Sequence, residues 1–402
     1  MTFKKTAETL SPKATTLKRE YYTNPNILEQ EYDKIFSVNW VCAGRASDFQ
    51  ENSQYQVLNI GRESVIILRD DKGELKAFYN VCRHRGTRIC NNSSGKFSKS
   101  IQCGYHGWTY DLNGDLIGAP HMEEISGFDK QDFPLHPVEI AEWEGFIFIN
   151  LMDDPEEFEH FFEPLIGRFN AWGLPNLVTE ETREYAVKSN WKLVVQNYCE
   201  CYHCPILHPE LAAIHYYMGG KNDLYDGPFL GGYMDFNKDK KSITESGELS
   251  CPPLEGLKGD DLNRVYYYYI FPNMLLSLHP DYVMYHSVWP KGVDECKVTC
   301  HWLFSKETVN SGNYNTKDAI NFWDMTNNQD WYISELSQLG VQSKKYFPSP
   351  YSGQESLLAA FDKFYLSRLE SVNGRSSQHS ICLLYTSPSP RDLSTSRMPS
   401  SA

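Results

Sequence analysis

Hydrophobic and polar positions follow two different periods along the chain, and the first half is dominated by short β-like runs. A polar start is followed by residues 26–37, whose apolar positions fall on one face of a helix. Between about residues 39 and 153, alternating or apolar runs are separated by turn residues, at 55–60, 64–69, 74–80 and 145–151. This block predicts a small all-β domain.

The pattern changes after an acidic stretch at 153–159. A strand-like segment precedes a helical one at 191–204, which we expect Pro205 to end. The strand-like segment is 182–189. Further strands are predicted at 264–271, 281–289 and 296–304, and long helices at 316–339 and 353–371. Strands followed by long helices indicate an α+β domain, with helices packed on an antiparallel sheet.

These patterns divide the chain into four expected segments. Residues 1–38 should pack with the second domain, 39–153 form the all-β domain and 154–373 form the α+β domain. The last segment, 374–402, turns rich in serine and proline and loses all periodicity. Within it, the stretch CLLYTSPSPRD resembles the translation of a sequencing adapter, so we expect a non-native tail without function.

Charge and cysteine usage narrow the classes of function. The chain has 38 Lys and Arg against 52 Asp and Glu, a net charge of −14, which argues against a nucleic-acid surface. It shows neither an apolar run of the ~18 residues that a membrane span needs nor an export signal. We therefore expect a cytoplasmic protein without membrane partner, whose 11 cysteines are reduced or metal-bound rather than disulfide-bonded.

The all-β block contains two pairs of metal-ligating side chains. Cys82 and His84 form a Cys-x-His pair, and Cys103 and His106 form a Cys-x-x-His pair. A [2Fe–2S] centre with mixed ligation needs two thiolates and two imidazoles. Zinc accepts the same ligand types, but its pairs usually come as two cysteines and two histidines, so the spacing favours the iron–sulfur cluster.

These motifs, and the block from about 39 to 153, resemble the Rieske family. Rieske proteins of respiratory complexes carry an extra cysteine in each loop, whereas Thr87 and Tyr105 stand at those positions here. The loops are therefore similar to those of Rieske oxygenases. Cys90 has no partner in this pattern, and we expect it to be a small buried side chain.

A second cluster of candidate ligands lies in residues 190–209, NWKLVVQNYCECYHCPILHP. Glu200 and His203 are three residues apart and would share a helix face. His208 would point elsewhere on a continuous helix, but Pro205 should break the helix and let the chain fold back. Two imidazoles and one carboxylate on an open face are the ligands of non-haem Fe(II) oxygenases.

This segment resembles the catalytic motif of the Rieske non-haem iron oxygenases. The resemblance implies that His203 and His208 bind a mononuclear iron. It gives Glu200 a bridging position towards a cluster histidine of an adjacent subunit, and it also matches Asn197, which we include among the catalytic residues.

By the same resemblance, the third iron ligand should lie on the long helix at 316–339. Asp330 fits the family pattern and shares a stripe with Trp323 and Ile333, where a carboxylate is costly unless it binds something. Asp324 is the second candidate.

Two other groups have a simpler interpretation. Glu157 and His160 repeat the Glu-x-x-His spacing, but no bundle-length helix surrounds them, so we expect a solvated surface. Three cysteines near the iron motif span more than one helix face, and we expect small buried side chains at positions 199, 201 and 204.

The two motifs together predict an enzyme in which a cluster relays electrons to an iron that activates O2. The resemblance implies a helix-grip catalytic fold with a curved antiparallel sheet, a head-to-tail homotrimer, and a separate NAD(P)H-dependent flavin and iron–sulfur reductase. Glu200 within ECYHC is similar to the branch that oxidises quaternary amines such as glycine betaine, carnitine or choline. An aromatic ring-hydroxylating dioxygenase alpha subunit is the alternative, and an electron carrier without oxygenase activity is a second one.

Tyrosines on the predicted strands are candidates for the substrate pocket, because aromatic faces hold a cationic head group. Only alternate residues of a strand face one side, and packing in the core is an equally open interpretation. The candidates are Tyr266, Tyr268, Tyr282 and Tyr285.

Overall fold

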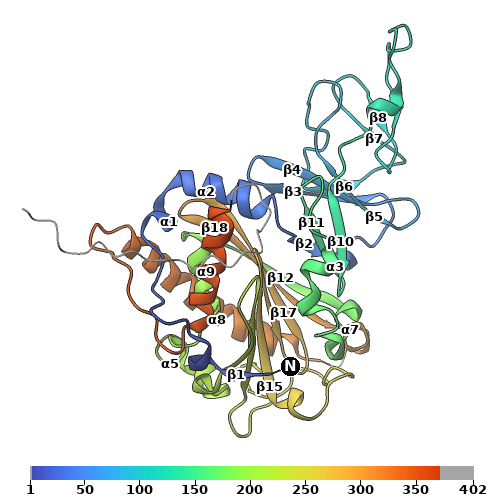
Figure 1. Ribbon diagram of the computed structural model, residues 1–402. Helices are drawn as coiled ribbons and strands as arrows, with labels where there is room; N and C mark the ends of the chain where they lie inside the picture. The colour runs from blue at the N-terminus through green and yellow to red at the C-terminus, as the bar shows by residue number, and fades with distance from the viewer. Residues whose placement is uncertain (1, 313, 372–402) are drawn as a thin grey trace, which may run out of the picture.

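The larger part of the chain is built on one eight-stranded antiparallel sheet (Figure 1). The computed structural model describes residues 2–312 and 314–371, so the predicted tail at 374–402 lies outside the described residues. The strand order is β1-β13-β14-β15-β16-β17-β18-β12. The bounds are β1 Lys4–Lys5, β12 Leu177–Val187, β13 Lys221–Tyr225, β14 Phe229–Asp235, β15 Arg264–Ile270, β16 Met274–Leu278, β17 Val283–Gly292 and β18 Glu295–Ser305.

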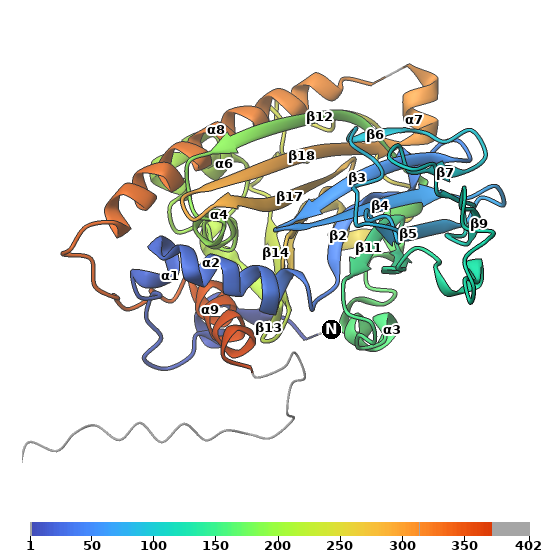
Figure 2. The ribbon, with the colours of Figure 1, turned by 90° about the horizontal axis from the view of Figure 1, so that it is seen from above.

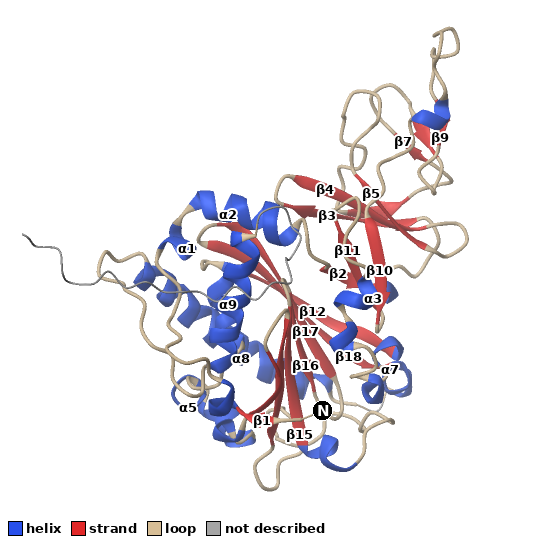
Figure 3. Ribbon diagram, viewed as in Figure 1, coloured by secondary structure: helices blue, strands red, loops and turns tan. Residues whose placement is uncertain are grey.

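Long helices cover one face of this sheet (Figure 3). They are α4 Trp191–Tyr198, α8 Thr316–Val341 and α9 Ser356–Glu370, and α4 lies against both β17 and α8. Helix α8 buries one stripe at spacings of three and four residues, which fixes the face it turns to the sheet. No helix in the described ranges is long and apolar enough to cross a membrane.

Shorter helices complete this part of the chain. The N-terminal segment contributes helices next to α8 and α9, and a π-helical turn extends α2 over Tyr32–Phe36. The short α-helices are α1 Glu20–Thr23, α2 Pro25–Glu31, α3 Phe158–Phe161, α5 Cys204–Leu207, α6 Pro209–Ile214 and α7 Lys306–Ser311.

A buried carboxylate ties the N-terminal segment to the large domain. Glu31 and Lys192 are both fully buried, and the Lys192 ammonium lies 2.5 Å from a Glu31 oxygen. Trp191 Nε1 and the Tyr365 hydroxyl also donate to Glu31, at 2.7 and 2.5 Å. Burial lowers the pKa of Lys192 while the Glu31 carboxylate opposes that shift. The paired charges therefore hold α2, α4 and α9 together.

The all-β part consists of three small antiparallel sheets, ordered β10-β11-β2, β5-β4-β3-β6 and β7-β8-β9. The last of them lies at the end of the molecule far from α4 and α6 (Figures 1 and 2). The bounds are β2 Val41–Arg45, β3 Gln54–Ile60, β4 Glu63–Arg69, β5 Leu75–Tyr79, β6 Ser94–Lys96, β7 Ile101–Gln102, β8 Thr109–Tyr110, β9 Leu116–Gly118, β10 Glu139–Trp143 and β11 Phe146–Asn150.

The two parts share a continuous core. The ring of Phe146 on β11 meets Tyr285 on β17 edge-to-face, with ring centroids 5.0 Å apart. The guanidinium of Arg45 lies 4.6 Å from the Phe146 ring centroid and donates to the carbonyls of Leu174 and Leu177. The sheet β10-β11-β2 therefore packs against the face of the large sheet opposite to α4 and α8.

The predicted helix at 191–204 is wrong in its second half. Helix α4 ends at Tyr198, and Pro205 lies in the first turn of a new helix, α5, rather than ending the old one. Proline is tolerated there because the first helical N–H groups have no partner within the helix. Between the two helices, the Glu200 carboxylate accepts hydrogen bonds from the backbone N–H groups of Tyr202 and His203. Glu200 and His203 therefore do not share a helix face.

The sequence pattern also missed strand β16. All five of its residues are buried, so it shows no alternation of polar and apolar positions. An apolar run of this length has no period that identifies it as a strand.

Candidate metal centres

Two loops of the same shape present the first set of candidate ligands. In one loop the Gly86 N–H donates to the Cys82 carbonyl at 2.9 Å, and in the other the Gly107 N–H donates to the Cys103 carbonyl at 3.1 Å. Both glycines have a positive φ, at 71° and 72°, which favours glycine. The sequence thus repeats one tight turn after each cysteine.

The four candidate ligands of these loops fit a [2Fe–2S] cluster. Cys82 and Cys103 are buried free thiols, while the rings of His84 and His106 lie nearer the surface, with centroids 4.6 Å apart. Burial raises the pKa of Cys103, and the neighbouring Cys82 raises it further. A bound metal ion would stabilise the thiolate form of such a side chain. Buried thiolates for one iron and outer imidazoles for the other match mixed ligation. The Tyr110 hydroxyl lies 3.4 Å from the Cys82 sulfur.

The second set of candidate ligands gathers around one carboxylate oxygen. Asp330 Oδ1 lies 2.8 Å from His208 Nε2 and 3.5 Å from His203 Nε2. Asp330 comes from α8, His203 from the loop before α5, and His208 from the junction between α5 and α6. The structure therefore brings together three side chains that are up to 127 positions apart in sequence.

The other nitrogen of each ring is fixed by a hydrogen bond. His203 Nδ1 lies 2.5 Å from Glu200 Oε1, and His208 Nδ1 lies 2.6 Å from Gln329 Oε1. Since an oxygen acceptor takes the Nδ1 proton, both rings turn Nε2 towards Asp330. Gln329 was missed by sequence reasoning, because no spacing rule distinguishes a glutamine beside an acid on a polar helix.

The charges of this group call for a cation. Burial lowers the pKa of His203, but hydrogen bonds to Asp330 and Glu200 outweigh burial and raise this pKa to about 10. Two carboxylates and two imidazoles in a largely buried site are stabilised by added positive charge. Two neutral imidazoles and one carboxylate around an open position are the donor set that suits non-haem iron, so the residues fit this metal.

The alternative candidates lie elsewhere. Asp324 accepts a hydrogen bond from the Tyr185 hydroxyl at 2.6 Å and pairs with Arg183 at 2.6 Å, away from the histidines. Glu157 and His160 are exposed, as expected for a solvated surface. Neither pair belongs to the group around Asp330.

A cavity opens beside the three gathered ligands, on the helix-covered face of the large sheet. Aromatic rings from β14, β15, α4 and α8 contribute to its wall, and Asn197 and Glu200 also border it. The aromatic lining residues are Tyr198, Tyr217, Tyr233, Tyr267, Tyr269 and Trp323.

The tyrosines predicted for the pocket are wrong. On β15 the cavity side carries the odd-numbered positions, whereas Tyr266 and Tyr268 face the opposite core and pack against Trp172 and Phe169. Alternation was expected correctly, but hydrophobicity gave no means of choosing between two faces that are both covered.

The two predicted tyrosines of the neighbouring strand region are also core residues. The Tyr282 hydroxyl donates to the Ile243 carbonyl at 2.6 Å, and the Tyr285 ring stacks on His301 with centroids 4.4 Å apart. Neither borders the cavity.

The expectation of reduced thiols is wrong at one pair. Cys201 and Cys204 form a disulfide, whereas Cys199 is a buried free thiol. Cys90 is buried and free, as predicted. The pair encloses His203, and sequence spacing alone did not separate it from the other small buried cysteines.

The two domains, with their two sets of candidate ligands, are those of a Rieske non-haem iron oxygenase. A Rieske [2Fe-2S] domain model matches residues 39–130, and a model of the ring hydroxylating alpha subunit (catalytic domain) matches residues 174–371. The chain belongs to this family, and it is an oxygenase that uses a [2Fe–2S] cluster and a mononuclear iron.

The chain resembles particular oxygenases over most of its length. The chain is 29% identical over 401 residues to the glycine betaine monooxygenase oxygenase subunit of Pseudomonas aeruginosa, covering 90% of this chain and 91% of the relative. It superposes on a quaternary ammonium Rieske monooxygenase with a TM-score of 0.74 at 23% identity, covering 92% of this chain and all of the other. Naphthalene 1,2-dioxygenase from Rhodococcus sp. gives a TM-score of 0.71 at 18% identity, covering 88% and 94%. The fold is therefore common to amine and arene oxygenases.

Proposed function

We propose that this chain is the oxygenase component of a monooxygenase that hydroxylates a carbon attached to the nitrogen of a quaternary amine. The observation that carries this proposal is the cavity beside His203, His208 and Asp330, whose wall is rich in aromatic rings. Similarity to a glycine betaine monooxygenase over nine tenths of the chain supports the same substrate class.

The wall of the cavity suits a cation better than an arene. Ring faces attract a quaternary ammonium group, which forms no hydrogen bonds of its own, and this attraction strengthens when water is excluded. The described part of the chain places no lysine or arginine in the lining. A carboxylate on the substrate would find no lysine or arginine to pair with, so the aromatic faces around the cationic end provide the recognition.

One unsatisfied group also points into this site. The hydroxyl of Tyr267 is buried and has no hydrogen-bond partner among the described residues, although Tyr267 borders the cavity. Buried hydroxyl groups are normally hydrogen-bonded. A polar group of the substrate, or a water molecule beside it, would satisfy this hydroxyl.

We assign the metal ligands from the geometry described above. Cys82, His84, Cys103 and His106 would hold the cluster, and two histidines with Asp330 would hold the mononuclear iron, which supplies O2 activation when bound. Glu200 holds the His203 ring through Nδ1 at 2.5 Å. Asn197 borders the same cavity and is available to position substrate.

We further propose a head-to-tail homotrimer and a separate reductase. Strands β7 and β8, which flank the loop with His106, lie at the opposite end of the molecule from α5, which follows the loop with Glu200 (Figure 1). A neighbouring subunit would bring its cluster loops to Glu200, and a head-to-tail contact of this kind closes into a ring. The sequence contains no dinucleotide-binding glycine motif, so NAD(P)H would act through a flavin and iron–sulfur reductase.

The reaction class sets the test. Hydroxylation next to the quaternary nitrogen gives a hemiaminal, which collapses to a tertiary amine and an aldehyde, whereas an arene would give a dihydrodiol. Reductase-coupled O2 uptake and product mass spectrometry should be measured with glycine betaine, carnitine and choline. Each needs its neutral control, in which a carbon replaces the nitrogen.

The expected result is O2 uptake and amine or aldehyde formation with at least one quaternary amine, and none with its neutral control. Equal turnover of the neutral control, or dihydrodiol formation from naphthalene, would contradict the proposal. Reduction of the cluster without uptake for any substrate would favour an electron carrier.

A further inference from the structure

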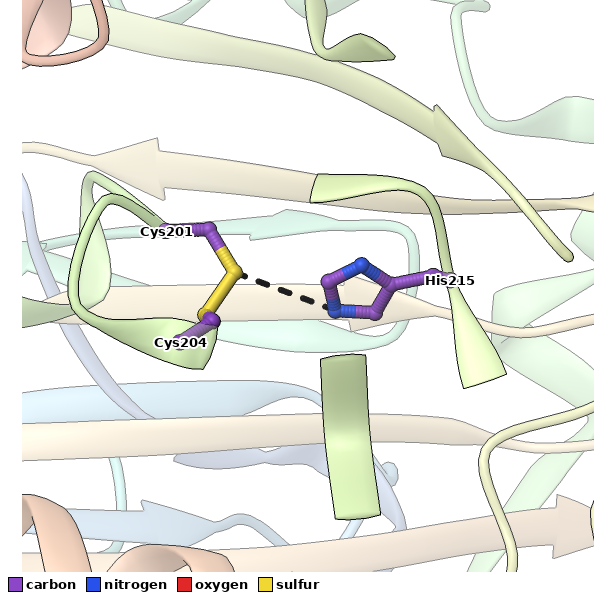
Figure 4. A group of neighbouring side chains, drawn as sticks. All are labelled: Cys201, Cys204 and His215. Carbon is purple, nitrogen blue, oxygen red and sulfur yellow. Dashed lines mark hydrogen bonds between the residues drawn. A yellow bond between two sulfur atoms is a disulfide. The ribbon is translucent and has the colours of Figure 1, made fainter. Parts of the chain in front are cut away.

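A disulfide joins Cys201 and Cys204 (Figure 4), and it closes a ring of four residues that includes His203. The two Cα atoms are 4.9 Å apart, inside the range from which a disulfide closes without backbone movement. Tyr202 and His203 are the residues between the two cysteines. One of the proposed iron ligands is thus part of the ring.

Both sulfur-bearing residues border the substrate cavity. Cys201 and Cys204 are largely buried, yet they line the same space as His203 and Asp330. His215 lines the same cavity, and its Nε2 lies 3.9 Å from Cys201 Sγ (Figure 4). A small molecule that enters the cavity therefore reaches the pair without unfolding of the chain.

This bond is exceptional within the described part of the chain. Eight other cysteines there are buried free thiols, including Cys199 two positions before the ring. A ring of four residues restricts the unfolded chain far less than a long loop does. The consequence of the bond is therefore local, on the position of His203, rather than on the stability of the whole fold.

The disulfide adds a covalent constraint to a segment that hydrogen bonds also hold. Between α4 and α5, its backbone is held by the Glu200 carboxylate and by a turn from Cys204 N–H to the Cys201 carbonyl at 3.2 Å. With the ring closed, His203 Nδ1 meets Glu200 at 2.5 Å and its Nε2 lies 3.5 Å from Asp330. The oxidised pair therefore coexists with a gathered set of iron ligands.

We propose that Cys201 and Cys204 are a reversible dithiol–disulfide pair, and that its oxidised form retains the mononuclear iron more tightly by fixing His203. In the closing step a low-molecular-weight disulfide is reduced. Its S–S bond breaks, the two cysteine thiols lose two electrons and form the new S–S bond, and their two protons leave with two small thiols. Excess dithiol reverses the exchange. This inference rests on the proposed iron site but not on the proposed substrate.

The test compares the two forms of the purified, iron-loaded chain under anaerobic conditions. Oxidised 2-mercaptoethanol closes the pair and tris(2-carboxyethyl)phosphine opens it, and mass spectrometry after alkylation shows which cysteines are free. Iron release to a ferrous chelator is then followed, while the visible spectrum of the cluster reports that the cluster and the fold are intact.

We expect the reduced form to release the mononuclear iron about 10-fold faster or more, the size of effect typical when support of a metal ligand is lost. Cys201→Ser and Cys204→Ser should release iron at the fast rate under both conditions. Cys199→Ser, the matched control, should keep the difference between the two forms.

Three results would overturn the proposal: alkylation of Cys201 and Cys204 that never changes with the redox reagent, equal iron release from both forms, or stoichiometric zinc uptake by the reduced form. Uptake of zinc would instead assign Cys201, Cys204 and His215 to a second metal site. Failure of the substrate proposal would appear in O2 uptake and leave these thiol and iron measurements unchanged.

Discussion

Replacing Gln329 tests whether the iron site depends on the hydrogen bond behind His208. Two consecutive residues of α8 hold the two nitrogens of this ring: Gln329 Oε1 lies 2.6 Å from Nδ1, and Asp330 Oδ1 lies 2.8 Å from Nε2. Gln329→Leu keeps the approximate volume but removes the acceptor. The ring would lose both its preferred tautomer and its orientation.

The expected magnitude follows from the chemistry of that hydrogen bond. His208 is 1% exposed, so water does not replace the missing acceptor, and a buried donor left unpaired costs about 1–3 kcal/mol. Loss of such a partner behind a metal-bound histidine typically lowers metal affinity about 10–100-fold. We therefore expect Gln329→Leu to weaken iron binding by roughly this factor.

The assay is anaerobic competition for Fe(II) between the chain and a chelator of known affinity, with the cluster spectrum as the check of folding. Gln329→Glu, which keeps an acceptor, should bind iron at least as tightly as the unmodified chain. Asn328→Ala is the matched control, because Asn328 is exposed and its side chain donates only to the Asp324 carbonyl. Equal iron affinity of Gln329→Leu and Asn328→Ala would refute the reasoning.

Three further predictions concern stability and the cavity. Lys192→Met leaves the Glu31 carboxylate buried without its cation, so we expect the free energy of unfolding to fall by about 3–5 kcal/mol. The midpoint of thermal unfolding should fall by about 5 °C, and an unchanged midpoint would contradict the role of this pair. Tyr267→Leu should raise KM for the quaternary amine about 5- to 30-fold because an aromatic face of the cavity is lost. Tyr266→Phe, on the opposite face of β15, should leave KM unchanged. Equal changes in KM for the two variants would exclude substrate recognition by Tyr267. Burial raises the pKa of Asp281 to about 6, so the stability contributed by its protonated form is full below about pH 4 and falls by up to about 3 kcal/mol as the pH rises through 6. Asp281→Asn should lack this dependence of the unfolding free energy on pH. Equal pH dependence of the variant and the unmodified chain would contradict the prediction.

Much of the fold was predictable because its elements carry a clear period. The long helices at 316–339 and 353–371 correspond to α8 Thr316–Val341 and α9 Ser356–Glu370, and the buried stripe of α8 follows spacings of three and four residues. The strands at 55–60 and 64–69 are equally well placed. Strand β16 escaped because complete burial removes the alternation on which the prediction depends.

The grouping of the candidate ligands was predictable for a different reason, since spacing and residue type together restrict the chemistry. The structure gathers Asp330 with His203 and His208, and it places Asp324 in a separate ion pair. Sequence reasoning failed where the answer depends on which face of a strand lines the cavity. It chose Tyr266 instead of Tyr267 on β15, because both faces of that strand are covered.

The remaining misses arise from contacts that spacing does not encode. The Gln329 side chain acts through a residue 121 positions away. The ring between Cys201 and Cys204 depends on an early end of α4, whereas a helix continued to residue 204 would keep the side chains of this segment on the helix surface. Both features became visible only once the path of the chain around His203 was known.

The most direct test of the account is the count of iron and acid-labile sulfide per chain after anaerobic purification and reconstitution with Fe(II). Two metal centres in one chain predict three iron atoms and two sulfide ions, with one iron removable by a chelator while the cluster spectrum persists. Asp330→Asn should lose that one iron and keep the other two. Zinc in place of iron, or a reconstituted chain that holds only the two cluster irons, would contradict the account.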